Sequence, residues 1–121
     1  MSFVRLDNEN KSITGNLVEL FKQEMLDHNG NKKFFPGIVL VDFDGVEQRM
    51  ILFHSTLKNL IGDALKMDAL NIEDSITINY LGKVEGGQGE YYHRYSLSIN
   101  DEEFVSGRVV LEKDDFLRSL E

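Results

Sequence analysis

Aromatic rings and cationic side chains recur close together along this chain, and their combination suits one kind of binding chemistry. They are found in residues 32–35, at Arg49 and Phe53, at Lys83 and in residues 91–95. Single-stranded nucleic acid is bound by stacking its bases on rings while Lys and Arg neutralise the phosphates. The residues that we predict to do this are Lys33, Phe34, Arg49, Lys83, Tyr92 and Arg94. The competing interpretation is that most of these rings belong to the hydrophobic core.

An acidic pair offers a different chemistry. Asp42 and Asp44 end an apolar run that begins at Ile38, and Gly45-Val46 follow them. This stretch resembles the first motif of the haloacid dehalogenase-like phosphatases, in which the first aspartate attacks phosphorus. That fold needs parallel strands joined by long crossovers. Here the next strand starts directly after the Asp-Gly turn and must return antiparallel, so we predict a hairpin and no catalytic residues.

Metal and cofactor sites are not predicted. Asp42, Asp44 and Glu47 are hard oxygen ligands, but no further acidic residues follow at the spacing of a calcium loop. The three histidines form no His-x-His or His-x3-His pair, and there is no cysteine to supply a thiolate. The turn at 86–89 is rich in glycine but lacks the Lys-Ser/Thr of a phosphate-binding loop. We interpret His93 as a core histidine.

The elements that must position these residues include a hairpin over 76–99, with residues 86–89 as its turn. Alternation with a period of two places alternate side chains on opposite faces. The inward row is predicted to contain Ile76, Ile78 and Tyr80 in the first arm and Tyr91, His93, Tyr95, Leu97 and Ile99 in the second. The outward row is predicted to contain Lys83, Tyr92 and Arg94.

A second hairpin joins a strand over 38–43 to a strand over 46–54, across Asp44-Gly45. Helical spacing then predicts a helix over 56–69, with Ser55 as its N-cap. Residues 13–21 fit either a strand or a helical stripe, and Ile13-Thr14 favours the strand. Further along, residues 104–111 are predicted to form a short strand or pair. Residues 114–120 are predicted to form a final short helix.

Composition restricts the kind of protein. A chain of 121 residues is long enough for one domain with a real core. It has no apolar run near the ~20 residues of a membrane span and no signal-peptide pattern. We therefore expect an intracellular, soluble protein. We divide it into an N-terminal strand and turn (1–12), a core (13–100) and an acidic C-terminal extension (101–121).

The net charge of −8 argues against a nucleic-acid partner, because phosphate binding needs cations. The charge is unevenly placed, however. Residues 1–100 contain 14 acidic and 10 basic side chains, whereas residues 101–121 contain 7 and 3. Such an acidic end is typical of an ordinary solvated helix, and it is also what a tail competing for a basic groove would look like.

The predicted order of elements, β-β-β-α-β-β, is similar to that of an OB-fold barrel over roughly residues 13–100. Residues 72–83, the glycine-rich turn and residues 91–99 resemble small phage-encoded single-stranded-DNA-binding proteins. The resemblance implies an OB barrel, a groove of rings and cations, and homo-oligomers. It also implies a role in phage replication or recombination alongside other replication or recombination proteins, in the cytoplasm of a bacterium or a phage-infected host cell. The chain departs from that family in lacking a long disordered acidic tail.

We therefore predict a mainly β, single-domain, OB-like five-stranded barrel with one central α-helix and a short C-terminal helix. The alternative is an α+β sheet with helices on one face, which follows if residues 16–26 are helical. The predicted function is non-catalytic binding of single-stranded DNA, without cofactor, metal or membrane, and RNA fits the same chemistry. The alternative function is that of an acidic protein-binding adaptor or phage accessory protein, motivated by the charge and by the apolar residues of 104–111.

Overall fold

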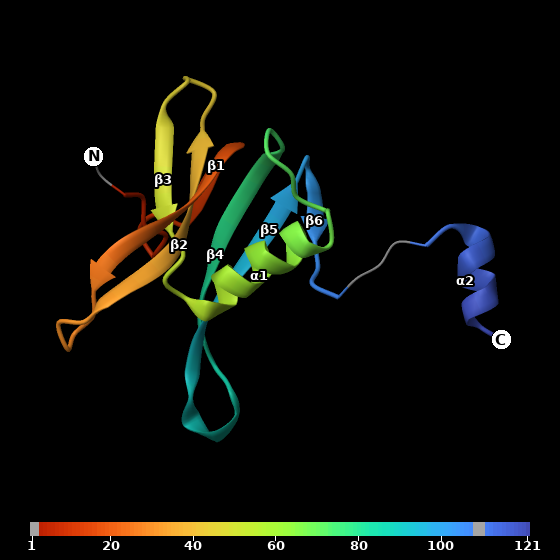
Figure 1. Ribbon diagram of the computed structural model, residues 1–121. Helices are drawn as coiled ribbons and strands as arrows, with labels where there is room; N and C mark the ends of the chain where they lie inside the picture. The colour runs from red at the N-terminus through yellow and green to blue at the C-terminus, as the bar shows by residue number, and fades with distance from the viewer. Residues whose placement is uncertain (1–2, 108–110) are drawn as a thin grey trace.

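A computed structural model describes residues 3–107 and 111–121 of the chain, except for the side chain of Gln88. The elements are β1 (Ser12–Leu26), β2 (Lys32–Val41), β3 (Glu47–Ile51), α1 (Ser55–Lys66), β4 (Ser75–Glu85), the 3-10 turn η1 (Gly87–Gly89), β5 (Tyr91–Ile99), β6 (Glu102–Phe104) and α2 (Lys113–Ser119). The strands form one antiparallel sheet in the order β3-β2-β1-β4-β5-β6, and α1 lies in front of β4 and β5 (Figure 1).

The predicted mainly β class is confirmed, but the sheet is open and six-stranded rather than a closed five-stranded barrel. Closure would need a backbone ladder between β3 and β5, and no such ladder occurs among the described residues. The N-terminal segment occupies the edge of β3 instead. Phe3 forms a parallel bridge with Arg49, and the Val4 amide donates to the Arg49 carbonyl at 2.7 Å. The backbone carbonyl of Arg49, at this edge of β3, is thus already bonded to the N-terminal segment.

Strand β1 joins the two halves of the sheet. Its first residues, from Ser12 to Asn16, pair with β4, and the strand pairs with β2 from Asn16 onward. A register shift between Leu17 and Glu19 marks a bulge, which bends a strand and increases its twist. In Figure 1 the two halves of the sheet diverge from β1. Residues 16–26 are therefore strand, and the α+β alternative that required a helix there is wrong.

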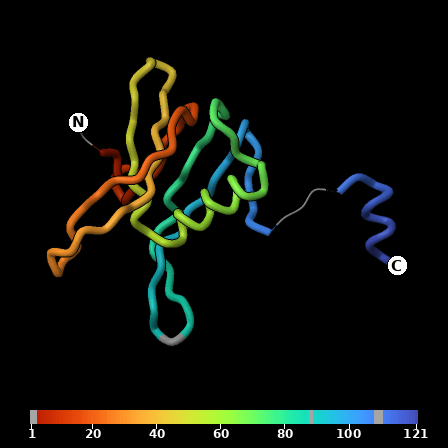
Figure 2. Tube along the Cα trace, viewed as in Figure 1, coloured from red at the N-terminus to blue at the C-terminus, as the bar shows by residue number. Residues whose placement is uncertain are grey.

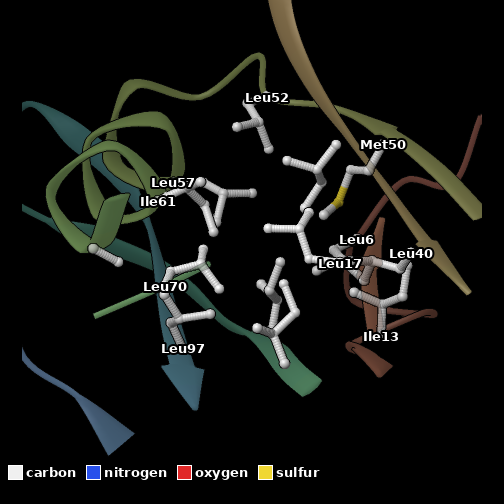
Figure 3. Packing of buried hydrophobic residues seen from close by; sticks show 14 of the residues in the cluster. Leu6, Ile13, Leu17, Leu40, Met50, Leu52, Leu57, Ile61, Leu70 and Leu97 are labelled. Carbon is white, nitrogen blue, oxygen red and sulfur yellow. The ribbon is translucent and has the colours of Figure 1, made fainter. Parts of the chain in front are cut away.

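The core lies between the two halves of the sheet and α1 (Figure 3). Alternate residues of the strands point inward, and α1 adds a stripe at helical spacing. The predicted inward positions at 76, 78, 80, 97 and 99 are confirmed by their burial. The largest fully buried side chains are Leu17, Ile38, Leu40, Ile61, Leu70, Ile76, Ile78 and Leu97.

Some predicted boundaries are wrong by several residues. Strand β2 begins at Lys32, earlier than the predicted 38, because it continues the hairpin with β1 beyond the core. Helix α1 begins at Ser55, so its N-cap is His54 and no side chain caps it. The helix ends at Lys66, before Asp68, whose φ of 57° is incompatible with helical backbone.

The C-terminal part contains the predicted short helix, here α2. The strand predicted within 104–111 is wrong for residues 105–107, which form no strand, and residues 108–110 lie outside the described residues. The edge strand that pairs with β5 is β6, which ends at Phe104. All residues of 111–121 are exposed, and the tube drawing shows α2 apart from the sheet (Figure 2). The described residues contain no helix that is both long and apolar enough to cross a membrane.

Gly15 allows β1 to pass close to β2. A Cβ at this position would lie 2.8 Å from the Val41 carbonyl oxygen and 3.1 Å from the Leu40 Cβ. We expect Gly15→Ala to lower the free energy of unfolding by about 1–3 kcal/mol, because backbone atoms must shift. Chemical denaturation measures the change. The control is Gly62→Ala on α1, which has open space and should gain about 0.5–1 kcal/mol; equal stability of the two variants would contradict the close approach.

Candidate nucleic-acid interface

The predicted residues of the first two hairpins lie on different faces of the sheet. Arg49 pairs with Val39, and cross-strand partners share a face. Lys33 lies an even number of residues before Val39 on β2, so its side chain is on the same face of the sheet as that of Arg49. This face points away from the core and is here called the outer face. Phe34 lies on the opposite face, where the Lys22 Nζ is 4.8 Å from its ring centroid.

In the predicted outward row, Tyr92 and Arg94 are exposed on the face away from the core, as predicted, and only the placement of Lys83 is wrong. Strand β4 shifts register next to Gly82, whose φ is 102°. Beyond this bulge Lys83 pairs with His93 and therefore lies on the core-side face, whereas Tyr92 and Arg94 lie on the other face. The reason is physical: one extra residue in a strand turns every following side chain to the opposite face.

Tyr91 was predicted to be in the core, and this is also wrong. Its side chain is 62% exposed, because the β4–β5 hairpin extends past the last core ring of β4, Tyr80. The Lys83 Nζ lies 5.2 Å from the centroid of the Tyr91 ring, within cation–π range. The far end of this hairpin thus presents a ring and a cation together on the core-side face.

Four side chains, His54, His93, Tyr80 and Tyr95, form a His–Tyr cluster between the start of α1 and β5. The two imidazoles stack with centroids 3.9 Å apart and planes 8° from parallel. His54 Nδ1 bonds the Tyr95 hydroxyl at 2.5 Å, and His93 Nδ1 bonds the Tyr80 hydroxyl at 2.8 Å. The Thr56 hydroxyl also donates to the His93 carbonyl at 2.5 Å. Side chains therefore connect the segment after β3 to β5, where no strand pairing does.

The surroundings favour the neutral imidazole of His54. Burial lowers its pKa below the ordinary 6.5, and the charges of His93 and Arg5 lower it further. Burial raises the pKa of the Tyr95 hydroxyl, and nearby Tyr80 raises it further. Sequence reasoning treated the histidines as isolated. Alternation indicated that His93 points inward, but no local signal showed that His54 would meet it.

A series of ring contacts, here called the ring track, leads from Lys33 on the outer face of β2 to Lys83 on the core-side face of the β4–β5 hairpin; Phe53 and His54 are linked in it as chain neighbours, and His93 and Lys83 by strand pairing. The Lys33 Nζ lies 5.4 Å from the Phe35 ring centroid, and the Phe35 and Phe53 rings meet edge to face at 5.1 Å. Phe53 immediately precedes His54, which stacks on His93, the cross-strand neighbour of Lys83. The ring track consists of Lys33, Phe35, Phe53, His54, His93, Lys83 and Tyr91.

A pocket of about 430 Å³ opens beside the middle of the ring track, between the N-terminal segment and the start of α1. Phe53 and His54 belong to both the ring track and the pocket wall. Arg5 and Tyr95 add polar groups to this wall. Sequence reasoning missed the pocket, because its walls come from segments that are distant in the chain.

The acidic pair has a structural role in the turn between β2 and β3. The Asp42 carboxylate accepts hydrogen bonds from the Asp44 and Val46 amides at 2.9 and 3.0 Å and from Gln48 Nε2 at 2.9 Å. The bonds from Val46 and Gln48 are the main causes that hold the pKa of Asp42 below its usual value. The two strands pair antiparallel, as predicted against the phosphatase motif. Within residues 3–107 and 111–121, no three His, Asp or Glu side chains are grouped to hold a metal ion.

Comparisons with protein-family models, with curated proteins and with solved structures found no match to this chain. The resemblance to phage single-stranded-DNA-binding proteins therefore stays a prediction. What the site can do has to be inferred from its own geometry.

The lowered pKa of His54 makes stability depend on pH. The unfolded chain takes up a proton near pH 6.5 while folded His54 resists it, so stability is present above this pH and decreases as the pH falls below it. We expect the melting temperature to fall between pH 7.5 and pH 5.5, measured by circular dichroism. His54→Asn should weaken this dependence, while His28→Asn in the exposed β1–β2 loop should not. An unchanged pH profile in His54→Asn would contradict the assignment.

Proposed function

We propose that this protein binds single-stranded DNA without catalysis, and that the strand follows the ring track. The observation that carries the proposal is the series of rings and cations from Lys33 through Phe35, Phe53 and the stacked histidines to Lys83 and Tyr91, joined by ring contacts, by chain adjacency and by strand pairing. Bases stack on rings irrespective of sequence, and each stacked base contributes about 1–3 kcal/mol. A series of rings with a cation near each end can therefore stack the bases of single-stranded DNA while the cations contact its phosphates.

The charge distribution supports the same path despite the net charge of −8. Neither Lys33 nor Lys83 forms a salt bridge among the described residues, whereas neighbouring Lys32 pairs with Glu24 at 3.4 Å. Both lysines of the ring track are therefore available for phosphates. Glu47 also lies on the outer face, but at the β2–β3 turn, away from Lys33 at the other end of β2.

We also propose that the open sheet is an OB-like barrel in which side chains replace the last strand pairing. Three features support this: β1 pairs with both β2 and β4, α1 connects β3 to β4, and the His–Tyr cluster links the segment after β3 to β5. OB-folds bind oligonucleotides on strands 2 and 3 and on the loops of the first and last hairpins. The ring track begins on β2 and ends on the β4–β5 hairpin, in agreement with that pattern.

Of the six sequence-predicted residues, Lys33 and Lys83 are on the proposed path and Arg49 flanks it on the outer face. Phe34 lies on the face of β2 opposite to Lys33, and Tyr92 and Arg94 lie on the face of the β4–β5 hairpin opposite to Lys83. These three residues would contact DNA only where the strand wraps around a hairpin. Action in phage replication or recombination, as a homo-oligomer, rests on the family resemblance.

Tyr91 tests the stacking part of the proposal, because it is exposed and lies beyond the core. We expect Tyr91→Ala to weaken binding of labelled oligothymidylate by about 5- to 150-fold at unchanged melting temperature. Fluorescence anisotropy at low salt measures the affinity. The matched control is Phe43→Ala, which removes a ring that is 97% exposed on the β2–β3 turn. Failure of the parent protein to bind at tens of micromolar would refute the function itself.

Lys33 tests the phosphate part. Each phosphate contact to a single strand contributes about 0.7 to the slope of log affinity against log salt. We expect Lys33→Ala to reduce the slope by about this amount, measured by repeating the titration at several salt concentrations. Lys66→Ala, at the end of α1 and off the ring track, is the control. Identical slopes for both variants would remove Lys33 from the path.

Helix α2 favours a second candidate function, the binding of another protein. Its side chains Phe116, Leu117 and Leu120 are 52%, 49% and 68% exposed, and Asp114 and Asp115 occupy its first turn. A helix of 7 residues is marginal in water unless its apolar side packs on something. The double variant Phe116→Ser, Leu120→Ser should abolish capture of a protein partner from a lysate while leaving oligonucleotide affinity unchanged. Capture that survives this change would exclude α2.

A further inference from the structure

We propose that the pocket beside the ring track holds a single nucleobase turned out of the stack, with the adjoining phosphate on Arg5. This inference rests on the proposed binding of single-stranded DNA and adds a site for one nucleotide to it. The pocket walls are formed by the N-terminal segment, by the end of β3 and the start of α1, and by Tyr95 of β5.

The pocket has the form that a flat ring requires. Its lining combines Phe3 and Phe53, which are 45% and 52% exposed, with Leu6, Met50 and Leu57, which are almost fully buried core residues. The volume of about 430 Å³ falls toward the lower end of the range of about 300–1,000 Å³ for small-molecule pockets. This space suits one base and its sugar.

Polar side chains in the lining are few, and they are Arg5, His54 and Tyr95. The His54 Nδ1 is occupied by the Tyr95 hydroxyl, so Nε2 is the ring nitrogen left for a ligand. In a neutral imidazole this nitrogen is a hydrogen-bond donor or an acceptor, depending on the tautomer. The edges of nucleobases carry both acceptors and donors, so either tautomer can find a partner there. The lowered pKa of His54 agrees with a neutral ring.

Arg5 provides the charge that a phosphate would need. Its side chain is exposed at the pocket wall and forms no salt bridge within the described parts of the chain. Its positive charge lowers the pKa of both His54 and Tyr95, so it lies near both of the other polar side chains of the lining. A cation, two rings and apolar lining residues together match a planar heterocycle that carries an anion.

Phe53 connects the pocket to the proposed path of the strand. Its ring packs against Phe35 on the ring track and also lines the pocket. A base stacked on Phe53 therefore needs only a local rotation of its own nucleotide to enter the pocket. The strand can continue past it toward His93 and Lys83.

The test uses the full chain, isotope-labelled, with thymidine 5′-monophosphate, thymidine and deoxyribose 5-phosphate as separate probes in NMR titrations. We expect the monophosphate to shift the resonances of Leu57, His54 and Tyr95 with saturation, thymidine to bind more weakly at the same place, and the sugar phosphate not to shift Leu57. Arg5→Gln should weaken the monophosphate about tenfold and leave thymidine unchanged, since only the charged contact is lost. Arg94→Gln, an exposed arginine on the opposite face of β5, is the matched control and should change neither.

The outcomes separate the two proposals. If oligothymidylate binds but no probe shifts the pocket resonances, or if Arg5→Gln and Arg94→Gln behave alike, the pocket inference is wrong and the ring track stands. If oligothymidylate does not bind at all, the proposed function is wrong, and saturating shifts by the monophosphate would then indicate a nucleotide site without a strand. If a fatty acid such as dodecanoate shifts the pocket and the monophosphate does not, the occupant is an apolar carboxylate instead.

Discussion

The structure depends on the change of partner along β1. Near Asn16 this strand stops pairing with β4 and continues along β2, and the nearby bulge gives it the bend that this requires. Gly15 makes the change possible, since a side chain there would collide with the backbone of Val41. The buried residues of the two halves, apart from Val39 and Ile51 on the outer face, meet in one core because this single strand belongs to both.

The same geometry explains why the site is built from side chains. Bending β1 brings β3 and β5 toward each other without pairing them, and the edge of β3 is bonded to the N-terminal segment. The space between them is spanned by stacked imidazoles and tyrosine hydroxyls. Such a connection leaves rings, ring nitrogens and a pocket accessible, whereas a continuous backbone ladder would have covered them.

Much of the fold was predictable because its signals are local. The period of two over 76–80 and 95–99 identified the inward rows, and the helical stripe of Leu57, Ile61 and Ala64 identified α1. The Asp-Gly turn indicated an antiparallel return and so excluded the phosphatase geometry. The errors arose where one residue changes the phase: the bulge beside Gly82 moved Lys83 to the other face, and the length of the β4–β5 hairpin carried Tyr91 beyond the core.

The sequence by itself determined the mainly β class and the helix after the second hairpin, and it placed rings and cations close together along the chain, because each depends on neighbours in the chain. Tertiary structure alone decided that the sheet stays open, that His54 stacks on His93 and that Arg5 lies beside both His54 and Tyr95. These contacts join residues tens of positions apart. Their geometry depends on how far β1 bends and on which backbone groups of β3 are already bonded to the N-terminal segment. No local sequence pattern encodes either of these.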